Sequence, residues 1–473
     1  MKKIIASVLC FTMCAAMFAG CKSDDGSTTT TTSGANGGGE GSTTTTVQEV
    51  IGTGDKEIKV YAMSPEVPGM IEEYAKRNPD FASTYKINAT TITNTDSAYE
   101  LALNAALTAG GDEAPDLYVA EADYILPYTQ GEFMDFAAPY SDFIDDVDGK
   151  LKAADIAQYT VELGTNTDGK LVALCYQCTG GAFIYRRSIA KEVFGSDDPE
   201  TVQEAIGAGT QSWDKFWDAA DKLKAAGYAI VSGADDIWNV VEKASSQPWV
   251  VDGKLVIDPM RDQYLDIYKK LVDNGYSNNT DSWSEAWKAD MAGLGEKQVF
   301  GFFGPAWLIN YTIGENCGGE DGTYGDWAVC VPPVGFWWGG SWLCVNKAAL
   351  EDEEKKAAIS ALVEWITLDC TEDGLLYAWA NGLLNENGTK DTVSSGTVMK
   401  MSDGSMGILD GQNPFEIFVD ATKYASAKCK CEYDSTFNGA FKDQAKAYAN
   451  GEKSRDEAIN EFKNKVYEAG VEI

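Results

Sequence analysis

Short apolar stretches alternate with longer amphipathic stretches through most of the chain. Residues 57–63, 85–92 and 115–120 are short and apolar, which predicts strands. Residues 67–77 and 97–110 lie between them and repeat their apolar positions at helical spacing. Strands that alternate with helices in this way are typical of α/β proteins, so we expect an α/β fold.

Two later segments carry an apolar stripe at helical spacing. In residues 212–226, with Ser212 as the expected N-cap, the stripe comprises Trp213, Phe216, Trp217, Ala220 and Leu223. In residues 353–369 it comprises Ala357, Ala358, Ala361, Leu362, Trp365 and Ile366. Residues 440–470 predict a charged helical region with too few apolar residues to be stable alone. Tryptophans on these stripes are expected in the core.

The N-terminus has the pattern of an export signal. Residues 1–21 begin with two lysines and continue as an apolar run, which predicts a signal peptide and is short for a membrane span. The end of this run, Phe18 to Cys21, resembles a bacterial lipobox, so we expect lipidation at Cys21. An ordinary signal peptide cut nearby is the alternative. Residues 22–55 are rich in Thr, Gly and Ser and predict a disordered tether. The predicted location is the extracellular face of a bacterial cell membrane.

The amino-acid composition excludes several classes of function. The chain has 473 residues, 38 Lys and Arg against 73 Asp and Glu, a formal charge of −35, and no histidine. The lack of histidine excludes imidazole-based catalysis and imidazole metal ligands. The negative charge argues against nucleic acids and against anionic membrane surfaces, since both attract clustered Lys and Arg. We therefore expect membrane contact through the lipid anchor only.

The cysteines form two close pairs in the sequence, Cys175 with Cys178 and Cys429 with Cys431. Together they could be a four-thiolate zinc site. However, the first pair lies in an extended-looking run, where side chains three positions apart point to opposite faces. Buried thiols or one or two disulfides of open connectivity are favoured, and we expect no metal and no cofactor.

The order of several segments resembles the family 1 extracellular solute-binding proteins, the carbohydrate-binding components of ABC importers. The resemblance runs from about residue 56 to 470. It rests on Pro115-Asp116 at a strand start with Glu121 and Asp123 behind it, and on segments 169–187, 212–217, 297–307, 326–347 and 362–382.

This resemblance implies two α/β lobes, joined by crossovers, that hold a ligand between them. Lobe one would comprise residues 56–176 and 335–380, and lobe two residues 177–334 and 381–473. The protein would be a monomer that captures a sugar, expected to be an oligosaccharide, and passes it to the permease of an ABC transporter. Whether the calcium sites of some relatives persist stays open.

A sugar site needs aromatic rings against C–H faces and short polar groups against hydroxyls. The resemblance points to Glu121 and Asp123 in an acidic loop, and to aromatic residues at Trp238, Trp307, Trp379, Phe415 and Phe418. Trp337, Trp338 and Trp342 flank Gly339-Gly340, where the lack of side chains allows a ligand to approach the backbone. Positions 338 and 342 would share a strand face, whereas 337 faces the other way, so at least one of the three is expected in the core.

Two other classes of protein are alternatives to a solute-binding protein. A glycoside hydrolase needs only two carboxylates, and among 73 acidic residues a suitable pair arises by chance. The G-x-S-x-G, Walker and H-E-x-x-H motifs are absent from the sequence. A surface adhesin would show repeats or β-sandwich modules, and neither is visible. We therefore expect a binding protein and not an enzyme.

Overall fold

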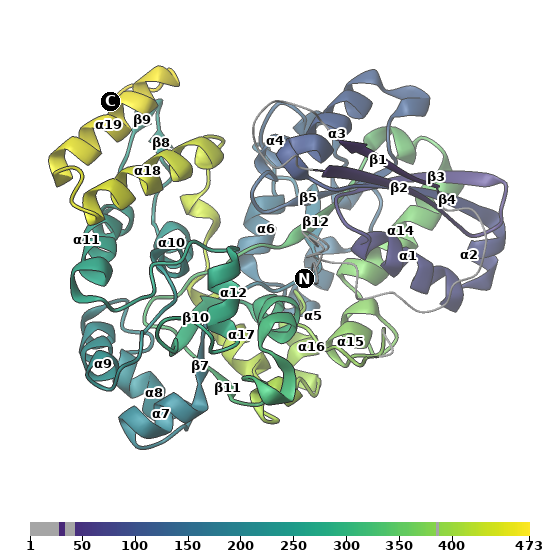
Figure 1. The fold of residues 1–473 in the computed structure, drawn as a ribbon. Coiled ribbons are helices and arrows are strands. Elements are labelled where there is room, and N and C mark those ends of the chain that lie inside the picture. The colour runs from purple at the N-terminus through teal and green to yellow at the C-terminus, as the bar shows by residue number, and fades with distance from the viewer. Residues whose placement is uncertain (1–27, 34–42, 385–386) are drawn as a thin grey trace, which may run out of the picture. The chain divides into compact units, whose positions relative to one another are not determined.

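The computed structural model describes residues 28–33, 43–384 and 387–473 (Figure 1). The predicted signal peptide, residues 1–21, and its Cys21 lie outside the described residues. The chain divides into two compact units: unit 1 is Met1–Tyr118 with Leu384–Gly388, and unit 2 is Val119–Leu383 with Thr389–Ile473. The lobe boundaries implied by the resemblance stay a prediction.

Unit 1 is built on parallel strands covered by helices. Strands β3 (Lys56–Ala62) and β4 (Tyr85–Ile92) pair in parallel, and the first residues of β5 (Leu117–Glu121) extend the sheet beside β3. The helices are α1 (Glu66–Arg77), α2 (Pro79–Thr84) and α3 (Ala98–Ala109). Every second residue of β3 from Ile58 onward is buried, as expected for a strand with one face on a core. The predicted strands and helices of this region are confirmed.

The prediction of a disordered tether is wrong for part of residues 22–55. Strand β2 (Thr43–Ile51) pairs antiparallel with β4, and β1 (Thr28–Ser33) pairs antiparallel with β2. Thr and Val are β-branched and fit a pleated sheet, and without β2 the backbone groups on this edge of β4 would be unpaired. The disorder was predicted because Thr, Gly and Ser side chains are too small and polar to fill a hydrophobic core, but a strand at a sheet edge does not need to fill one.

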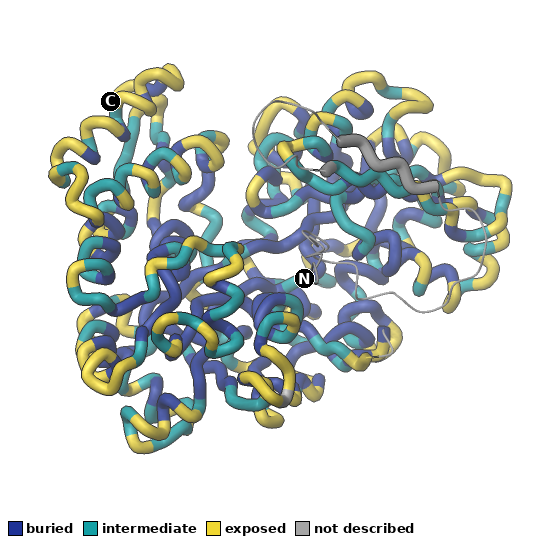
Figure 2. The backbone as a smooth tube through the Cα atoms, in the orientation of Figure 1, coloured by how far each residue is buried: buried dark blue, intermediate teal, exposed yellow. Residues whose placement is uncertain are grey.

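Unit 2 contains the larger set of elements. Strand β12 (Ser341–Val345) lies between the end of β5 and strand β6 (Ala173–Cys175). Strands β12 and β6 pair antiparallel. A second sheet has the order β10 (Gly301–Gly304), β7 (Ala182–Arg186), β11 (Trp327–Cys330), all antiparallel. Strands β8 (Val250–Val251) and β9 (Lys254–Leu255) form a short hairpin. The three strands of the second sheet are buried along their whole length (Figure 2).

The helices of unit 2 differ widely in length. They are α4 (Leu126–Thr129), α5 (Val147–Ala154), α6 (Gln158–Gly164), α7 (Arg187–Phe194), α8 (Pro199–Ile206), α9 (Asp214–Ala225), α10 (Ala234–Lys243), α11 (Pro259–Asn274), α12 (Glu285–Met291), α13 (Gly314–Asn316), α14 (Glu353–Thr367), α15 (Leu375–Ala380), α16 (Gly396–Met401), α17 (Phe415–Ala421), α18 (Asp434–Ala449) and α19 (Arg455–Glu468). Among the described residues, no helix is both long and apolar enough to cross a membrane.

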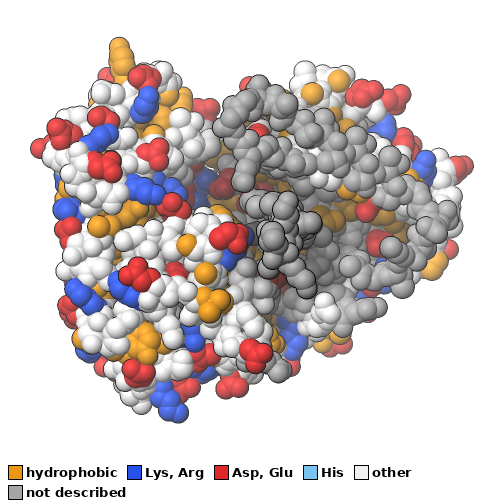
Figure 3. Space-filling model, in the orientation of Figure 1, with side chains coloured by type: hydrophobic (Ala, Val, Ile, Leu, Met, Phe, Trp, Pro, Cys, Tyr) orange, Lys and Arg blue, Asp and Glu red, His pale blue; other side chains and the backbone are white. Residues whose placement is uncertain are grey.

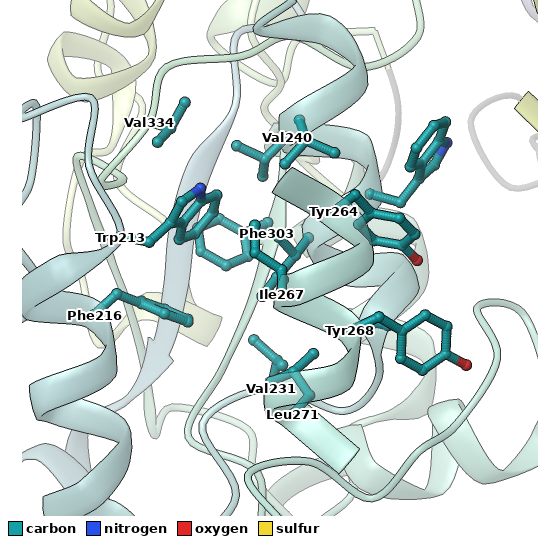
Figure 4. Close-up of a cluster of buried hydrophobic side chains, with 14 of the residues drawn as sticks. Trp213, Phe216, Val231, Val240, Tyr264, Ile267, Tyr268, Leu271, Phe303 and Val334 are labelled. Atoms are coloured by element: carbon teal, nitrogen blue, oxygen red, sulfur yellow. The ribbon is translucent and has the colours of Figure 1, made fainter. Parts of the chain in front are cut away.

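The core around the second sheet confirms the first predicted stripe. Trp213 and Phe216 lie edge to face, with ring centroids 5.3 Å apart, and meet Phe303 of β10 (Figure 4). Ala220 and Leu223 are also buried, and Trp217 packs partly against the same core. Trp213, not Ser212, occupies the N-cap position, although the Ser212 hydroxyl accepts a hydrogen bond of 3.2 Å from the Asp214 N–H.

The stripe predicted for residues 353–369 is partly wrong. In α14, Ala357 and Ala361 are exposed, whereas Ile359 and Val363 are buried beside the three large predicted residues. Burying a branched side chain removes far more apolar surface from water than burying a methyl group, so the helix turns its larger residues inward.

The C-terminal helices complete this core. Phe437 and Phe441 of α18, and Phe462 and Val466 of α19, join the same buried cluster. At the start of α19, Ser454 and Glu457 form a reciprocal capping box. The helical prediction for residues 440–470 is confirmed, and these few aromatic residues supply the packing that the charged helices need.

Candidate functional site

A pocket of 350 Å³ opens in unit 2, lined by side chains from α10, α18 and three loops. The lining residues are Asp123, Asp235, Trp238, Asn239, Glu242, Lys243, Ser282, Trp283, Trp338, Asn438, Gly439 and Lys442. Helix α10 contributes five of them because positions 235, 238, 239, 242 and 243 fall on one helical face. Aromatic, acidic, basic and amide groups therefore converge on one volume.

Three tryptophans from separate segments form a cluster at this pocket. The rings of Trp283 and Trp307 are nearly parallel, with centroids 6.1 Å apart and an angle of 8°. Trp338 stands edge-on to both, at 6.0 Å from Trp283 and 4.8 Å from Trp307. The Trp307 indole N–H donates a hydrogen bond of 3.1 Å to the Trp338 carbonyl. Trp283 is 36% exposed, so part of its ring is available to a ligand.

The glycine pair beside these tryptophans has a packing role. Gly339 and Gly340 have φ angles of +86° and +116°, which L-residues with a side chain rarely adopt. A Cβ on Gly339 would lie 3.2 Å from the indole nitrogen of Trp307, and one on Gly340 would lie 3.1 Å from the Trp342 ring. The close approach expected at this pair is therefore made by indole rings of the protein itself.

A buried network of charges lies at one end of the pocket. The Lys430 ammonium is 2.9 Å from Asp434 and 3.8 Å from Glu242, and Lys243 is hydrogen-bonded to Glu242. All four side chains are at most 4% exposed. Burial disfavours the Glu242 charge, but Lys243 and Lys430 outweigh it and lower the pKa of Glu242 to about 2. Burial also opposes the Lys430 charge, yet Glu242, Asp434 and Asp123 raise the pKa of Lys430 above its usual value. The ammonium groups are thus neutralised by the protein.

The predicted acidic loop meets this network. The Asp123 carboxylate is 70% exposed and lies 4.0 Å from the Lys430 ammonium. Burial, and then the proximity of Asp123, raise the pKa of Glu121 to about 8. Asp123 therefore presents an accessible carboxylate to the pocket, whereas Glu121 lies next to the pocket lining.

Amide and hydroxyl groups complete the lining. The Asn438 side chain accepts a hydrogen bond of 2.7 Å from the Trp249 indole and donates one of 3.1 Å to Glu242. The Lys442 ammonium is bonded at 2.9 Å to Asp235. On the face seen in Figure 3, acidic and basic side chains of unit 2 are interspersed and do not form a patch of one sign. Direct and bridged hydrogen bonds to a neutral polar ligand are the chemistry that such a lining supports.

Four of the predicted residues come together at this pocket. Asp123, Trp238 and Trp338 line it, and Trp307 contacts the Trp338 ring without lining the pocket itself. Trp238 is only 4% exposed and packs edge-on against Tyr264 at 4.8 Å. The pocket therefore joins residues that lie more than two hundred positions apart in the sequence.

Five predicted aromatic residues lie elsewhere, in the interior. Each is at most 1% exposed: Trp337, Trp342, Trp379, Phe415 and Phe418. Trp337 and Trp342 donate their indole N–H groups to the carbonyls of Ser426 and Thr160, at 2.9 and 2.8 Å. Trp337 is buried and Trp338 lines the pocket. Strand β12 starts only at Ser341, so the strand face predicted for 338 and 342 does not form.

Sequence reasoning missed several residues of this site. The most informative is Trp283, whose backbone is in the left-handed region with a φ of +70°. A bulky residue at positive φ is a genuine outlier and a frequent mark of functional sites, but the sequence does not reveal it. The polar residues of α10 and α18 were missed because charged helix faces are usually solvated surface.

The cysteines that the structure describes are all free thiols, and six of the eight are buried. Burial raises the pKa of the Cys178 thiol to about 11, which disfavours its thiolate. Within residues 28–33, 43–384 and 387–473, no group of three His, Cys, Asp or Glu side chains could hold a metal ion. The four-thiolate arrangement weighed for the two pairs does not form among these residues.

Comparison with known proteins identifies the class. The model of the bacterial extracellular solute-binding protein family matches residues 69–373, more than half of the chain. The chain belongs to this family, whose members bind substrates and are not enzymes. No curated protein sequence matches the chain.

Solved structures show the same fold at low sequence identity. One, described as an extracellular solute-binding protein of family 1, has 18% identity and a TM-score of 0.69, covering 88% of this chain and 99% of its own. The galacto-N-biose-/lacto-N-biose I-binding protein from Bifidobacterium longum, solved with lacto-N-biose, has 17% identity and a TM-score of 0.62, covering 89% and 99%. The substrate-binding protein Lmo0181 from Listeria monocytogenes, solved with cycloalternan, has 15% identity and a TM-score of 0.59, covering 88% and 100%. The fold is that of the two-lobe solute-binding proteins, which confirms the predicted α/β class.

Proposed function

We propose that this protein is the carbohydrate-binding component of an ABC importer, and that its ligand is an oligosaccharide. The observation that carries the proposal is the pocket in unit 2, where the Trp283, Trp307 and Trp338 cluster meets carboxylate, ammonium and amide groups. The family assignment supports a solute-binding role. The sugars named for two of the structural relatives support the class of ligand.

The chemistry of the pocket suits a neutral sugar. Indole rings can cover the apolar C–H face of a pyranose, with the C–H groups pointing at the ring face. Asp123 can accept hydrogen bonds from two neighbouring hydroxyls, and bonds to a charged acceptor are the stronger kind. A ligand carrying a carboxylate or phosphate would meet Asp123, Asp235 and Glu242, while Lys243 and Lys442 are already paired. Like charges in a partly desolvated pocket are unfavourable, which argues against an anionic ligand.

The proposed ligand-binding residues are therefore Asp123, Trp238, Trp283 and Trp338, with Trp307 as support. Glu121 lies close to Asp123, and its protonation state is proposed to change the electrostatic potential at the Asp123 carboxylate. The interior aromatic residues are left out of the proposed site because no ligand could contact their rings without unpacking the core. The protein is proposed to hold its ligand without cleaving it.

The proposed cellular setting is a lipid-anchored monomer at the outer face of the membrane, which delivers its ligand to the permease subunits. The lipobox-like end at Cys21 carries this part of the proposal. Cells that express the protein should incorporate labelled palmitate into it, and Cys21→Ala should abolish the label and release the protein from the membrane fraction. Label that persists in Cys21→Ala would contradict lipidation at this residue.

The binding proposal is tested with a glycan panel followed by calorimetry. A sugar that binds only the folded protein raises its unfolding temperature, because it adds RT ln(1 + [L]/Kd) to the stability. Trp338→Ala should weaken the affinity for that sugar by about 1–3 kcal/mol, the range known for removal of an aromatic side chain that stacks on a nucleic-acid base.

Trp217→Ala is the matched control, since Trp217 stacks on Tyr276 at 6.1 Å and does not line the pocket. It should leave the affinity unchanged. A panel without any stabilising sugar, or new reducing ends after incubation with the bound one, would overturn the proposal.

A further inference from the structure

The backbone at Trp283 is held in an unfavourable conformation. Its φ of +70° belongs to the left-handed region, which costs about 1–2 kcal/mol for a residue with a side chain. The residue is 36% exposed, so its ring is only partly held by the packing around it. A conformation of this kind persists only where neighbouring groups fix it.

The Asp235 carboxylate is bonded to the segment that carries Trp283. One oxygen, Oδ2, accepts a hydrogen bond of 3.2 Å from the backbone N–H of Ser282, and Oδ1 accepts one of 2.9 Å from Lys442 on α18. Asp235 lies in the first turn of α10, where the helix dipole favours a negative charge. A single carboxylate therefore joins two helices to the residue that precedes Trp283.

The other end of the segment is fixed as well. The Ser284 hydroxyl caps α12 by accepting a hydrogen bond of 3.2 Å from the N–H of Trp287. The Trp287 indole in turn donates one of 2.9 Å to Asp236, the neighbour of Asp235 on α10. Trp283 thus lies between two anchored positions, and its ring packs 5.3 Å from that of Trp287.

We propose that Asp235 is a positioning residue for ligand binding, which acts by holding Trp283 in its left-handed conformation so that the indole stays parallel to Trp307 and forms one wall of the pocket. This inference rests on the proposed function, since the wall it builds is the surface on which a sugar ring would stack. Asp235 also lines the pocket itself, so a direct contact with the ligand is the rival explanation that the experiment must separate.

The first measurement needs no ligand. The full chain is labelled with 5-fluorotryptophan, and the ¹⁹F resonance of Trp283 is assigned among the 13 tryptophans by its absence in Trp283→Phe. In Asp235→Ala this resonance should move toward that of a solvent-exposed indole. The resonances of Trp287, Trp307 and Trp338, whose rings contact Trp283, should move with it, while those of tryptophans outside this cluster stay. Asp235→Asn retains a carbonyl acceptor for the Ser282 N–H and should restore the resonance.

Asp262→Ala is the matched control. Asp262 on α11 is also a carboxylate bonded at 2.7 Å to a basic residue of another helix, Arg455, but it lies outside the pocket lining. It should leave the Trp283 resonance in place. Should Asp235→Ala fail to fold, Asp235→Ser, whose hydroxyl is too short to reach Ser282, serves for the same measurement. An unchanged Trp283 resonance in the folded variant would overturn the inference.

The second measurement separates positioning from direct contact, with the tightest-binding sugar of the glycan panel as the probe. Asp235→Ala should weaken binding about tenfold in the wild-type background and have no further effect in Trp283→Ala. Equal losses in both backgrounds would show a direct contact and overturn the inference. If no sugar binds, the proposed function fails, and the fluorine spectra still decide whether Asp235 positions Trp283.

Discussion

Removal of the Lys430 ammonium is expected to destabilise the protein strongly. The ammonium is 3% exposed and lies 2.9 Å from Asp434 and 3.8 Å from Glu242. With an effective dielectric constant of about 20, two unit charges at these distances attract by about 6 and about 4 kcal/mol. The desolvation of the buried ammonium offsets several kcal/mol of this attraction. We therefore expect Lys430→Met to lower the free energy of unfolding by about 3–5 kcal/mol at pH 7, the usual result when one partner of a buried pair is removed.

The assay is urea denaturation followed by tryptophan fluorescence and circular dichroism. The matched control is Lys400→Met, because Lys400 is bonded at 2.7 Å to Asp155 but is 62% exposed, and exposed pairs contribute at most about 1 kcal/mol. Lys430→Met combined with Asp434→Asn should recover part of the loss, since one uncompensated carboxylate is then gone.

The pH dependence gives an independent check on this network. The pKa of Glu242 is lowered to about 2, so its charge contributes stability that is present above its unfolded pKa near 4.5 and lost as the pH falls toward 2. In Lys430→Met the remaining carboxylates can bind protons instead, so the deficit relative to wild type should shrink as the pH is lowered from 7 to 4. A Lys430→Met variant as stable as Lys400→Met at pH 7 would refute the reasoning.

Three further predictions concern other groups of the molecule. Glu121 has a folded pKa of about 8, above its ordinary 4.5, so the stability of the wild type should fall as the pH rises from 5 to 8.5. In a series of thermal melts, Glu121→Gln should abolish this part of the fall. Parallel stability curves for the two proteins would contradict the prediction. Gly340→Ala places a Cβ 3.1 Å from the Trp342 ring at positive φ and should lower the free energy of unfolding by about 1–3 kcal/mol, measured by urea denaturation. The loss should exceed that of Gly451→Ala, where the added Cβ meets open space. Equal losses would contradict the prediction. When the native protein is titrated with a disulfide reagent, the partly exposed Cys370 and Cys431 should react first, and the six buried thiols should react only on unfolding. Fast reaction of all eight thiols would contradict this prediction.

Much of the fold was predictable because its cause is local. The alternation of apolar residues in 57–63 and 85–92 is set by the period of a strand, and β3 and β4 follow it closely. The predicted stripe through Phe216 and Leu223 likewise depends only on helical spacing. Strand β2 was missed because its pairing with β4 is a tertiary contact, and a threonine-rich run that pairs looks the same in sequence as one that does not.

The candidate site was predictable only in part, for a related reason. Asp123 and Trp238 were predicted through a resemblance and Trp338 from the glycine pair beside it, and all three line the pocket. Trp342 and Trp379 were predicted in the same way but lie in the core. A tryptophan in a core and one in a sugar site have the same chemistry, and only the packing around each ring separates them. Trp283 has a left-handed backbone, and the N–H of the preceding Ser282 donates to Asp235, 47 positions away, so no local pattern encodes this arrangement.

The proposed lipidation at Cys21, together with strand β1, would limit how far from the membrane the protein can stand. The strand begins at Thr28, seven residues after Cys21, and its pairing with β2 connects it to the sheet of unit 1. Even a fully extended chain advances at most about 3.6 Å per residue, so the proposed lipid and the edge of that sheet are separated by no more than about 25 Å. Unit 1 would then be held close to the lipid headgroups, at a distance from which it could contact a transporter in the same bilayer.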